Sequence, residues 1–171
     1  MVRATTRGFT LDGASDAAFR VAIAPLFEGA PGFLARLAAA RPFGSSAAMF
    51  ARAREIARSM PEAGQVELID AHPRLGAPRG AVSEHSFREQ GYDGASGATA
   101  SQAHIAAELD RLNDAYERRF GFRYCVFVAG RPRAALIPAM EAAFAADRST
   151  EIARALDAIV DIAADRWEKQ R

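Results

Sequence analysis

The helical character of the chain is clearest in the stretch EIARALDAIVDIAADRW (residues 151–167). Its apolar residues recur at intervals of three and four, which places them on one face of an α-helix. That face comprises Ile152, Leu156, Ile159, Val160, Ala163 and Trp167. Because such a stripe must be covered by other apolar surface, the stretch predicts a long helix packed against further helices.

The same periodicity occurs in most of the remaining chain. Apolar stripes with helical spacing predict helices over residues 49–60, 105–120 and 136–144, and two shorter ones over 16–23 and 31–40. Another helix should end at or before His72, since the residue before a proline is pushed out of the helical region. We therefore expect an all-α fold, a single-domain helical bundle covering residues 1–171.

Two regions break this pattern. Residues 72–100 contain prolines and several glycines and show no clear stripe, and long irregular loops of compact domains are usually functional or disordered. The second region, FGFRYCVFVAG (residues 120–130), has the β-branched and aromatic content of a strand, but no second strand is evident to pair with it. We expect an extended segment threaded between helices, whose main-chain groups need partners that a polar ligand can supply.

Composition excludes several classes of protein. The formal net charge of +1 argues against nucleic-acid binding, and the arginines are spread singly along helices, so most of them are expected on solvated helix faces. The single cysteine, Cys125, cannot form an internal disulfide and is expected to be a buried, inert thiol. No signal peptide and no apolar run of about 20 residues is present, so we expect a cytoplasmic protein without a membrane contact.

The sequence also offers no site for a common cofactor. The three histidines do not form a helical ligand pair, no cysteine pair exists, and no glycine-rich phosphate loop is found. We therefore expect neither a metal nor a cofactor, and any chemistry must come from ordinary side chains acting on a small molecule.

His72 is the first candidate for such chemistry. A histidine titrates near neutral pH and can accept or give a proton, and Pro73 fixes the backbone beside it. The alternative is a structural histidine that binds the last carbonyls of a helix.

Ser86, Glu89 and Gln90 form the second candidate group. Their spacing of three and four residues places them on one face of a helical turn, where they can hold a polar molecule. The alternative is a capping box, in which the serine and the glutamate satisfy main-chain N–H groups at a helix start.

Arg166 is the third candidate. It lies seven residues after Ile159, close to two helical turns, so it should project from the same apolar face. A guanidinium group on such a face needs an anionic or polar partner. It either clamps a carboxylate, for which its fork geometry is suited, or extends along the helix end to reach water.

Taken together, these residues resemble one family. The resemblance follows short motifs in a fixed order along most of the chain: Leu26-Phe27-Glu28, Arg41-Pro42-Phe43, Ala71-His72-Pro73-Arg74-Leu75-Gly76, Ser86-Phe87-Arg88-Glu89-Gln90, Leu112-Asn113-Asp114-Ala115-Tyr116, Arg119-Phe120-Gly121-Phe122 and Ile162-Ala163-Ala164-Asp165-Arg166. In this order and spacing they resemble the 2-oxo-4-hydroxy-4-carboxy-5-ureidoimidazoline (OHCU) decarboxylases.

This resemblance implies an all-helical, homodimeric and cofactor-independent enzyme of urate breakdown. It would remove carbon dioxide from OHCU, the product of urate oxidation and hydroxyisourate hydrolysis, to give S-allantoin. The resemblance implies that His72, Glu89 and Arg166 are catalytic. It assigns substrate binding to Pro73, Ser86, Gln90, Tyr124, Cys125, Val126, Phe127 and Val128, the last five through the main chain of the extended segment.

The chain departs from the family pattern at two places beside the expected pocket. Arg123 stands where many members have proline, and Gly91-Tyr92-Asp93-Gly94-Ala95 replaces the usual Ala-Gly-Leu. These departures leave two alternatives open. One is a decarboxylase of a related ureido or heterocyclic carboxylate on the same scaffold, and the other is a catalytically silent helical interaction module.

Overall fold

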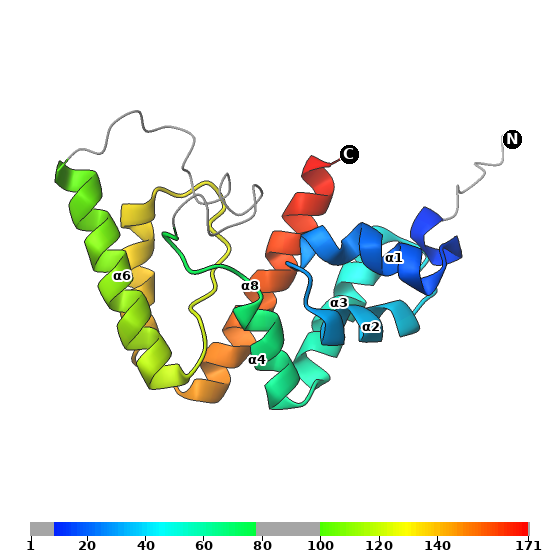
Figure 1. Ribbon diagram of the computed structural model, residues 1–171, viewed down its shortest axis with the longest axis horizontal. Helices are drawn as coiled ribbons and strands as arrows, with labels where there is room; N and C mark the ends of the chain where they lie inside the picture. Colours follow the sequence, from blue (N-terminus) through cyan, green and yellow to red (C-terminus); the bar gives the residue numbers. More distant parts are fainter. Residues whose placement is uncertain (1–8, 78–99, 171) are drawn as a thin grey trace, which may run out of the picture.

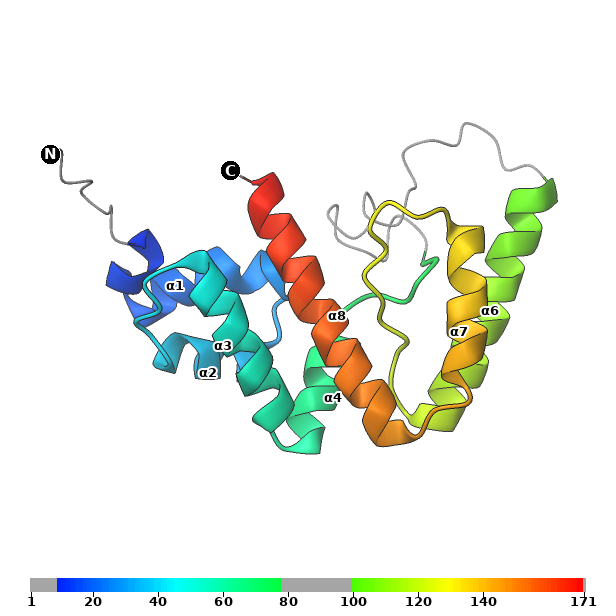
Figure 2. The same cartoon turned by 180° about the vertical axis from the view of Figure 1, so that it is seen from behind.

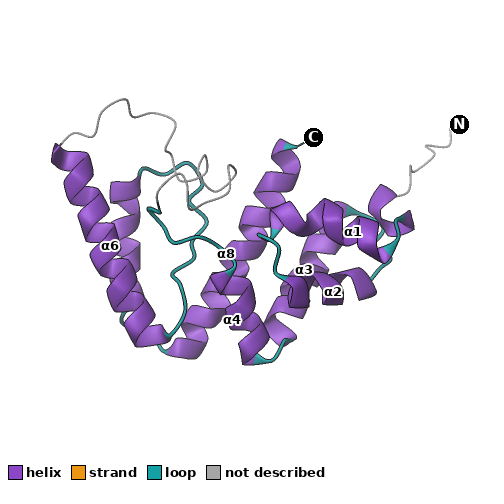
Figure 3. Cartoon of the chain, viewed as in Figure 1, coloured by secondary structure: helices purple, strands orange, loops and turns teal. Residues whose placement is uncertain are grey.

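Helices make up most of the structure. The computed structural model describes residues 9–77 and 100–170, and no residue in these two ranges is part of a β-strand (Figure 3). The all-α prediction is therefore confirmed. In chain order, the elements are η1 (Thr10–Gly13), α1 (Asp16–Ile23), η2 (Ala24–Leu26), α2 (Pro31–Ala39), α3 (Ser46–Ser59), α4 (Glu62–Asp70), α6 (Ala100–Phe120), η5 (Arg133–Leu136), α7 (Ile137–Ala143) and α8 (Arg148–Lys169).

Helix α8, which contains the stretch 151–167, lies in the middle of the arrangement (Figure 1). It packs against α3, α4 and the short helix η2. Viewed from both sides, α1, α2 and α3 lie toward one end of the molecule and the pair α6 and α7 toward the other (Figure 2). Helix α8, which lies between these two groups of helices, therefore forms part of the core of both halves.

The helices predicted from apolar periodicity occur where they were expected. Their ends follow local chemistry: the Asp147 carboxylate accepts a hydrogen bond from the Thr150 N–H at 2.7 Å at the start of α8, and Ser45 caps α3 in the same way through Ala48. Helix α4 ends at Asp70, two residues before His72, as the following proline requires.

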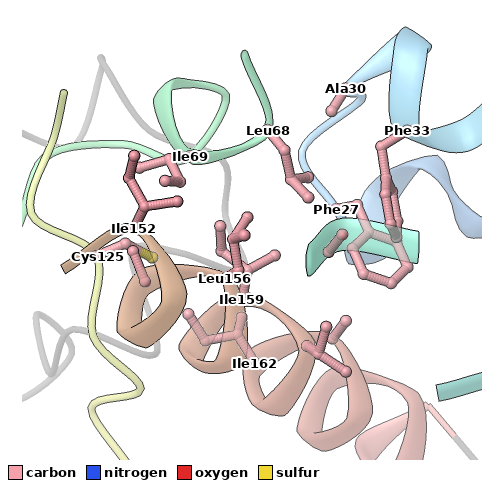
Figure 4. Packing of buried hydrophobic residues seen from close by; sticks show 14 of the residues in the cluster. Phe27, Ala30, Phe33, Leu68, Ile69, Cys125, Ile152, Leu156, Ile159 and Ile162 are labelled. Atoms are coloured by element: carbon pink, nitrogen blue, oxygen red, sulfur yellow. The ribbon is translucent and has the colours of Figure 1, made fainter. Parts of the chain in front are cut away.

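The core is a continuous cluster of apolar side chains centred on α8. Leu156 and Ile159 of α8 are 1% and 0% exposed, and they lie among side chains of α4 and of the segment around Phe27 (Figure 4). Cys125 reaches the same cluster beside Ile152. The apolar face of residues 151–167 is thus buried against segments that are widely separated in the sequence.

The extended segment predicted over residues 120–130 is present and runs between helices, and no strand of residues 9–77 or 100–170 pairs with it. Aromatic rings hold its first half against α6 and α7. The Tyr116 ring of α6 contacts the rings of Phe120, Phe122, Tyr124 and Phe144, with centroid distances of 4.5, 5.8, 5.1 and 6.0 Å. Offset and edge-to-face contacts of this kind stabilise a segment that has no ladder of main-chain hydrogen bonds.

Candidate active site

His72 follows the last turn of α4 and is almost completely buried. Its N–H donates to the Ile69 carbonyl at 3.1 Å, so the histidine continues the turn beyond the helix end. Pro73 then directs the chain away from the helix. The side chain is consequently held where α4 packs against α8, and His72 is 3% exposed.

The turn after His72 is anchored on α6. The buried Asn113 amide donates to the Leu75 carbonyl at 2.8 Å. Arg74 forms ion pairs with Asp114 at 2.6 Å and with Glu117 at 3.0 Å. The motif His72-Pro73-Arg74-Leu75-Gly76 is therefore held at both ends, by α4 before it and by α6 after it.

The His72 imidazole is neutral and has one nitrogen available. Its Nδ1 lies 3.2 Å from the Leu68 carbonyl, which can only accept, so Nδ1 carries the proton. Its Nε2 is buried and has no hydrogen-bond partner among the described residues. Burial, and secondarily the positive charge of Arg166, lower the pKa of His72 from 6.5 to about 4, although Glu28 and the Leu68 carbonyl oppose the shift. Near neutral pH, Nε2 is thus a proton acceptor.

Arg166 is buried on the same side of α8 as Ile159. It is 2% exposed, so the alternative in which its side chain extends into water is wrong. The guanidinium group donates to the Pro25 carbonyl at 2.9 Å and pairs with Glu28 at 2.8 Å. These contacts fix its position from two directions, as a rigid anion-binding group requires.

Two strained backbone positions accompany these residues. Within the described ranges, Glu28 and Ala129 are the non-glycine residues with positive φ, both at 52°. Each such conformation costs about 1–2 kcal/mol. Glu28 pairs with Arg166, and Ala129 lies at the end of the extended segment and lines the cavity, so the strain is located at the candidate site, where backbone strain is often found.

One cavity brings the predicted residues of the described ranges together. His72, Pro73, Arg166 and the whole run Tyr124–Val128 line it. Ser86, Glu89 and Gln90 lie outside the described residues, as does Gly91–Ala95. The cavity is also lined by residues that were not predicted: Leu75, Ala129, Gly130, Ile162, Asp165 and Lys169.

Helical spacing already contained the signal for two of these six missed residues. Ile162 and Lys169 lie four residues before and three residues after Arg166, so they share its face of α8. Asp165 pairs with Lys169 at 2.6 Å. Glu28, the partner of Arg166, had no such signal, because it meets α8 only in the folded chain.

Arg123 connects the extended segment to the end of α4 and to His72. Its main-chain N–H donates to the Asp70 carboxylate at 2.9 Å. Its guanidinium group donates to the carbonyls of Asp70 at 2.8 Å and His72 at 3.1 Å. A proline at this position, as in many members of the family it resembles, could make none of these three bonds. This departure therefore gives the chain its own link between α4 and the extended segment.

Residues 9–77 and 100–170 contain no group of three histidine, cysteine or acidic side chains arranged to hold a metal ion. Within the same ranges, no helix combines the length and the apolar composition needed to cross a membrane.

Comparison with known proteins assigns the chain to a family. The family model described as OHCU decarboxylase matches residues 12–168. The chain belongs to the OHCU decarboxylase family. A relative from Haloferax volcanii, named 2-oxo-4-hydroxy-4-carboxy-5-ureidoimidazoline decarboxylase, is 30% identical over 148 residues that cover 86% of each chain.

Another relative is longer. The uric acid degradation bifunctional protein PucL of Bacillus subtilis is 33% identical over 138 residues, which cover 81% of this chain but 27% of that protein. This chain therefore spans about a quarter of the length of PucL.

Solved structures of the family have the same fold. The crystal structure of OHCU decarboxylase in the presence of (S)-allantoin has a TM-score of 0.68 at 20% identity, covering 92% of this chain and 98% of that one. The crystal structure of (S)-allantoin synthase has a TM-score of 0.65 at 17% identity, covering 94% of this chain and 52% of that one.

Proposed function

We propose that this chain decarboxylates OHCU to (S)-allantoin without a cofactor, in urate catabolism. Family membership and relatives with this named activity support the reaction. The observation that carries the proposal is the convergence of two buried polar groups on one cavity. His72 presents a neutral imidazole, and Arg166, from a helix almost a hundred residues later, presents a fixed positive charge.

Arg166 and the extended segment hold the substrate. The guanidinium charge attracts the carboxylate or a ring carbonyl oxygen, with the strength of a charge in a site of low dielectric constant. Residues 124–128 line the same cavity, and in this proposal main-chain N–H groups of this run donate to further oxygens of the ring. Ser86, Glu89 and Gln90 complete the binding set in this proposal, with Glu89 orienting the substrate.

The reaction then needs electron delocalisation and proton transfer. The bond between ring carbon C4 and the carboxylate carbon breaks, and its electron pair passes into the adjacent C4–C5 bond as the C5–N double bond takes up a proton at nitrogen. His72 Nε2 accepts the proton of the 4-hydroxyl group as the ring carbonyl forms. The protonated His72 then returns this proton to one face of C5, while solvent supplies the proton at nitrogen and carbon dioxide leaves, so the product is single-handed.

The proposal is tested by the stereochemistry of the product. Urate oxidase and hydroxyisourate hydrolase generate OHCU in the cuvette, and circular dichroism follows its conversion. The purified chain should accelerate the reaction and give an excess of (S)-allantoin, whereas the spontaneous reaction gives a racemate. Absence of both effects would reject the activity.

A pair of variants tests the role of the histidine. His72→Ala should abolish the acceleration, because it removes the buried acceptor. His104→Ala is the matched control, since His104 is exposed on α6 and is not among the residues that line the cavity. Equal activity of the two variants would remove His72 from the mechanism.

Burial of the site residues and the position of Arg123 bear on the two alternatives that the sequence left open. An interaction module predicts that the polar side chains face solvent, but His72 and Arg166 are 3% and 2% exposed. A related ureido or heterocyclic carboxylate remains the second candidate substrate class, because Arg123 replaces proline behind the cavity. Turnover of a panel of such carboxylates, compared with OHCU, decides between the two.

We also propose a cytoplasmic homodimer. The dimer is what the resemblance to the family implies, and the single, buried Cys125 fits a reducing compartment. Light scattering after size-exclusion chromatography gives the mass directly, and a monomer at micromolar concentration would contradict the assembly.

A further inference from the structure

Two arginines bind the carbonyl groups of the extended segment. Arg154 of α8 donates to the Cys125 carbonyl at 2.8 Å. Arg131 donates to the carbonyls of Phe127 at 2.6 Å and Val128 at 3.0 Å. Guanidinium groups thus bind these carbonyl groups, which no strand of the described part of the chain pairs with.

The N–H groups of the same peptides point away from the two arginines. In a planar trans peptide the C=O and the following N–H point in opposite directions, so the Val126 N–H points away from Arg154 and the Val128 N–H away from Arg131. Neither N–H has a hydrogen-bond partner among residues 9–77 and 100–170. Both residues line the cavity, where a substrate oxygen can accept from them.

Arg154 is itself held rigidly. Its Nε donates to both oxygens of Glu151, at 3.1 and 2.9 Å, and its guanidinium carbon lies 4.6 Å from the centre of the Tyr124 ring. Glu151 is buried and also accepts from the Tyr116 hydroxyl at 2.6 Å. A group fixed on three sides can impose one orientation on the peptide that it binds.

We propose that Arg154 is a positioning residue of the decarboxylase site: by binding the Cys125 carbonyl, it directs the Val126 N–H at the substrate oxygen on which negative charge accumulates. The inference rests on the proposed function. Preorganised N–H donors of this kind lower the barrier because they need no rearrangement as charge develops, and loss of one such donor lowers kcat by about 10²–10³-fold in a well-studied protease. Arg154 touches no reacting atom in this scheme and acts only through the peptide.

The experiment compares Glu151→Gln with the double variant Arg154→Met/Glu151→Gln. Arg154→Met alone would leave the Glu151 carboxylate buried without its cation, and the protein could unfold for that reason. Both compared variants lack that carboxylate, and they differ in the bond to Cys125. Urea unfolding of each establishes that both are folded before their kinetics are compared.

The positioning role predicts a drop in kcat of about 10- to 100-fold from the single to the double variant, with KM within about threefold. A merely structural role predicts a drop in stability with the same kcat per folded molecule. Equal kcat values for the two variants would overturn the inference.

Nuclear magnetic resonance gives a readout that does not depend on turnover. In ¹⁵N-labelled wild type and in Glu151→Gln, added (S)-allantoin should shift the Val126 amide resonance, and in the double variant it should not. An identical response in all three proteins, or none in any, would overturn the inference. Failure of the proposed function is distinguishable, because it appears as wild-type protein that does not accelerate decarboxylation.

Discussion

The neutral state of His72 makes the stability of the protein depend on pH. The folded imidazole has a pKa of about 4, and an exposed histidine has a value of 6.5. The unfolded chain therefore binds a proton between these values that the folded chain does not bind. Stability is fully present above pH 6.5 and is lost as the pH falls toward 4, because protonation favours the unfolded state.

The size of the effect follows from the two pKa values. At pH 5 the imidazole is almost fully protonated in the unfolded chain and about one-tenth protonated in the folded chain. Between pH 7 and pH 5, this group alone should lower the free energy of unfolding by about 2 kcal/mol. Burial is the main cause, Arg166 adds to it, and Glu28 and the Leu68 carbonyl reduce it.

Urea unfolding at pH 7 and pH 5 measures this loss for the wild type and for His72→Asn. Carboxylates also titrate in this range, but they contribute equally to both proteins, so the difference between the two pH dependences isolates the histidine. His104→Asn is the matched control and should behave as the wild type, because His104 is exposed. Equal pH dependences of wild type and His72→Asn would refute a neutral, buried His72 and with it the role of Nε2 as a proton acceptor.

Three further substitutions test the contacts around the cavity and in the core. Arg166→Met should lower the free energy of unfolding by about 3–5 kcal/mol, because the Glu28 carboxylate loses its cation, and Arg166→Met/Glu28→Gln should recover part of that loss; no recovery would contradict the ion pair. Asn113→Ala should cost about 1–3 kcal/mol in the same urea assay, since its buried amide holds the turn after the site histidine, and a cost below 0.5 kcal/mol would contradict that anchor. Leu156→Ala should cost about 2–5 kcal/mol through the cavity it leaves, whereas Val21→Ala, at a 75% exposed position, should change stability by less than about 0.5 kcal/mol.

The helices of this chain were predictable because their signal is local. A helix needs an apolar stripe and suitable end residues, and both depend on residues that are close together in the sequence. Residues 151–167 and the proline that follows His72 are examples. The same locality identified Arg166, whose spacing from Ile159 placed it on the buried face. The extended segment was predictable from its composition together with the absence of a second strand.

The partners of these residues were not predictable, since they depend on how distant segments meet. Nothing near Glu28 in the sequence indicates that it pairs with Arg166, and nothing near Cys125 indicates that its carbonyl binds Arg154. The pKa of His72 likewise depends on burial that only the assembled fold produces. Sequence periodicity identifies which face of a helix is buried, but it does not identify what lies opposite that face.

The arginines show the limit of the sequence interpretation most clearly. Their spread along the helices suggested solvated helix faces for most of them, but Arg123 and Arg154 are only partly exposed, and their guanidinium groups donate to main-chain carbonyls of the irregular segments beside the cavity. A buried segment without regular secondary structure has no ladder to satisfy its carbonyl groups, and a guanidinium group brings five donors to that task. Lysine offers three donors on a point charge, and Lys169 is the only lysine in the chain. Satisfying these carbonyls with side chains leaves N–H groups of the same segment for a ligand, so the arginines that stabilise the wall also determine what it can bind.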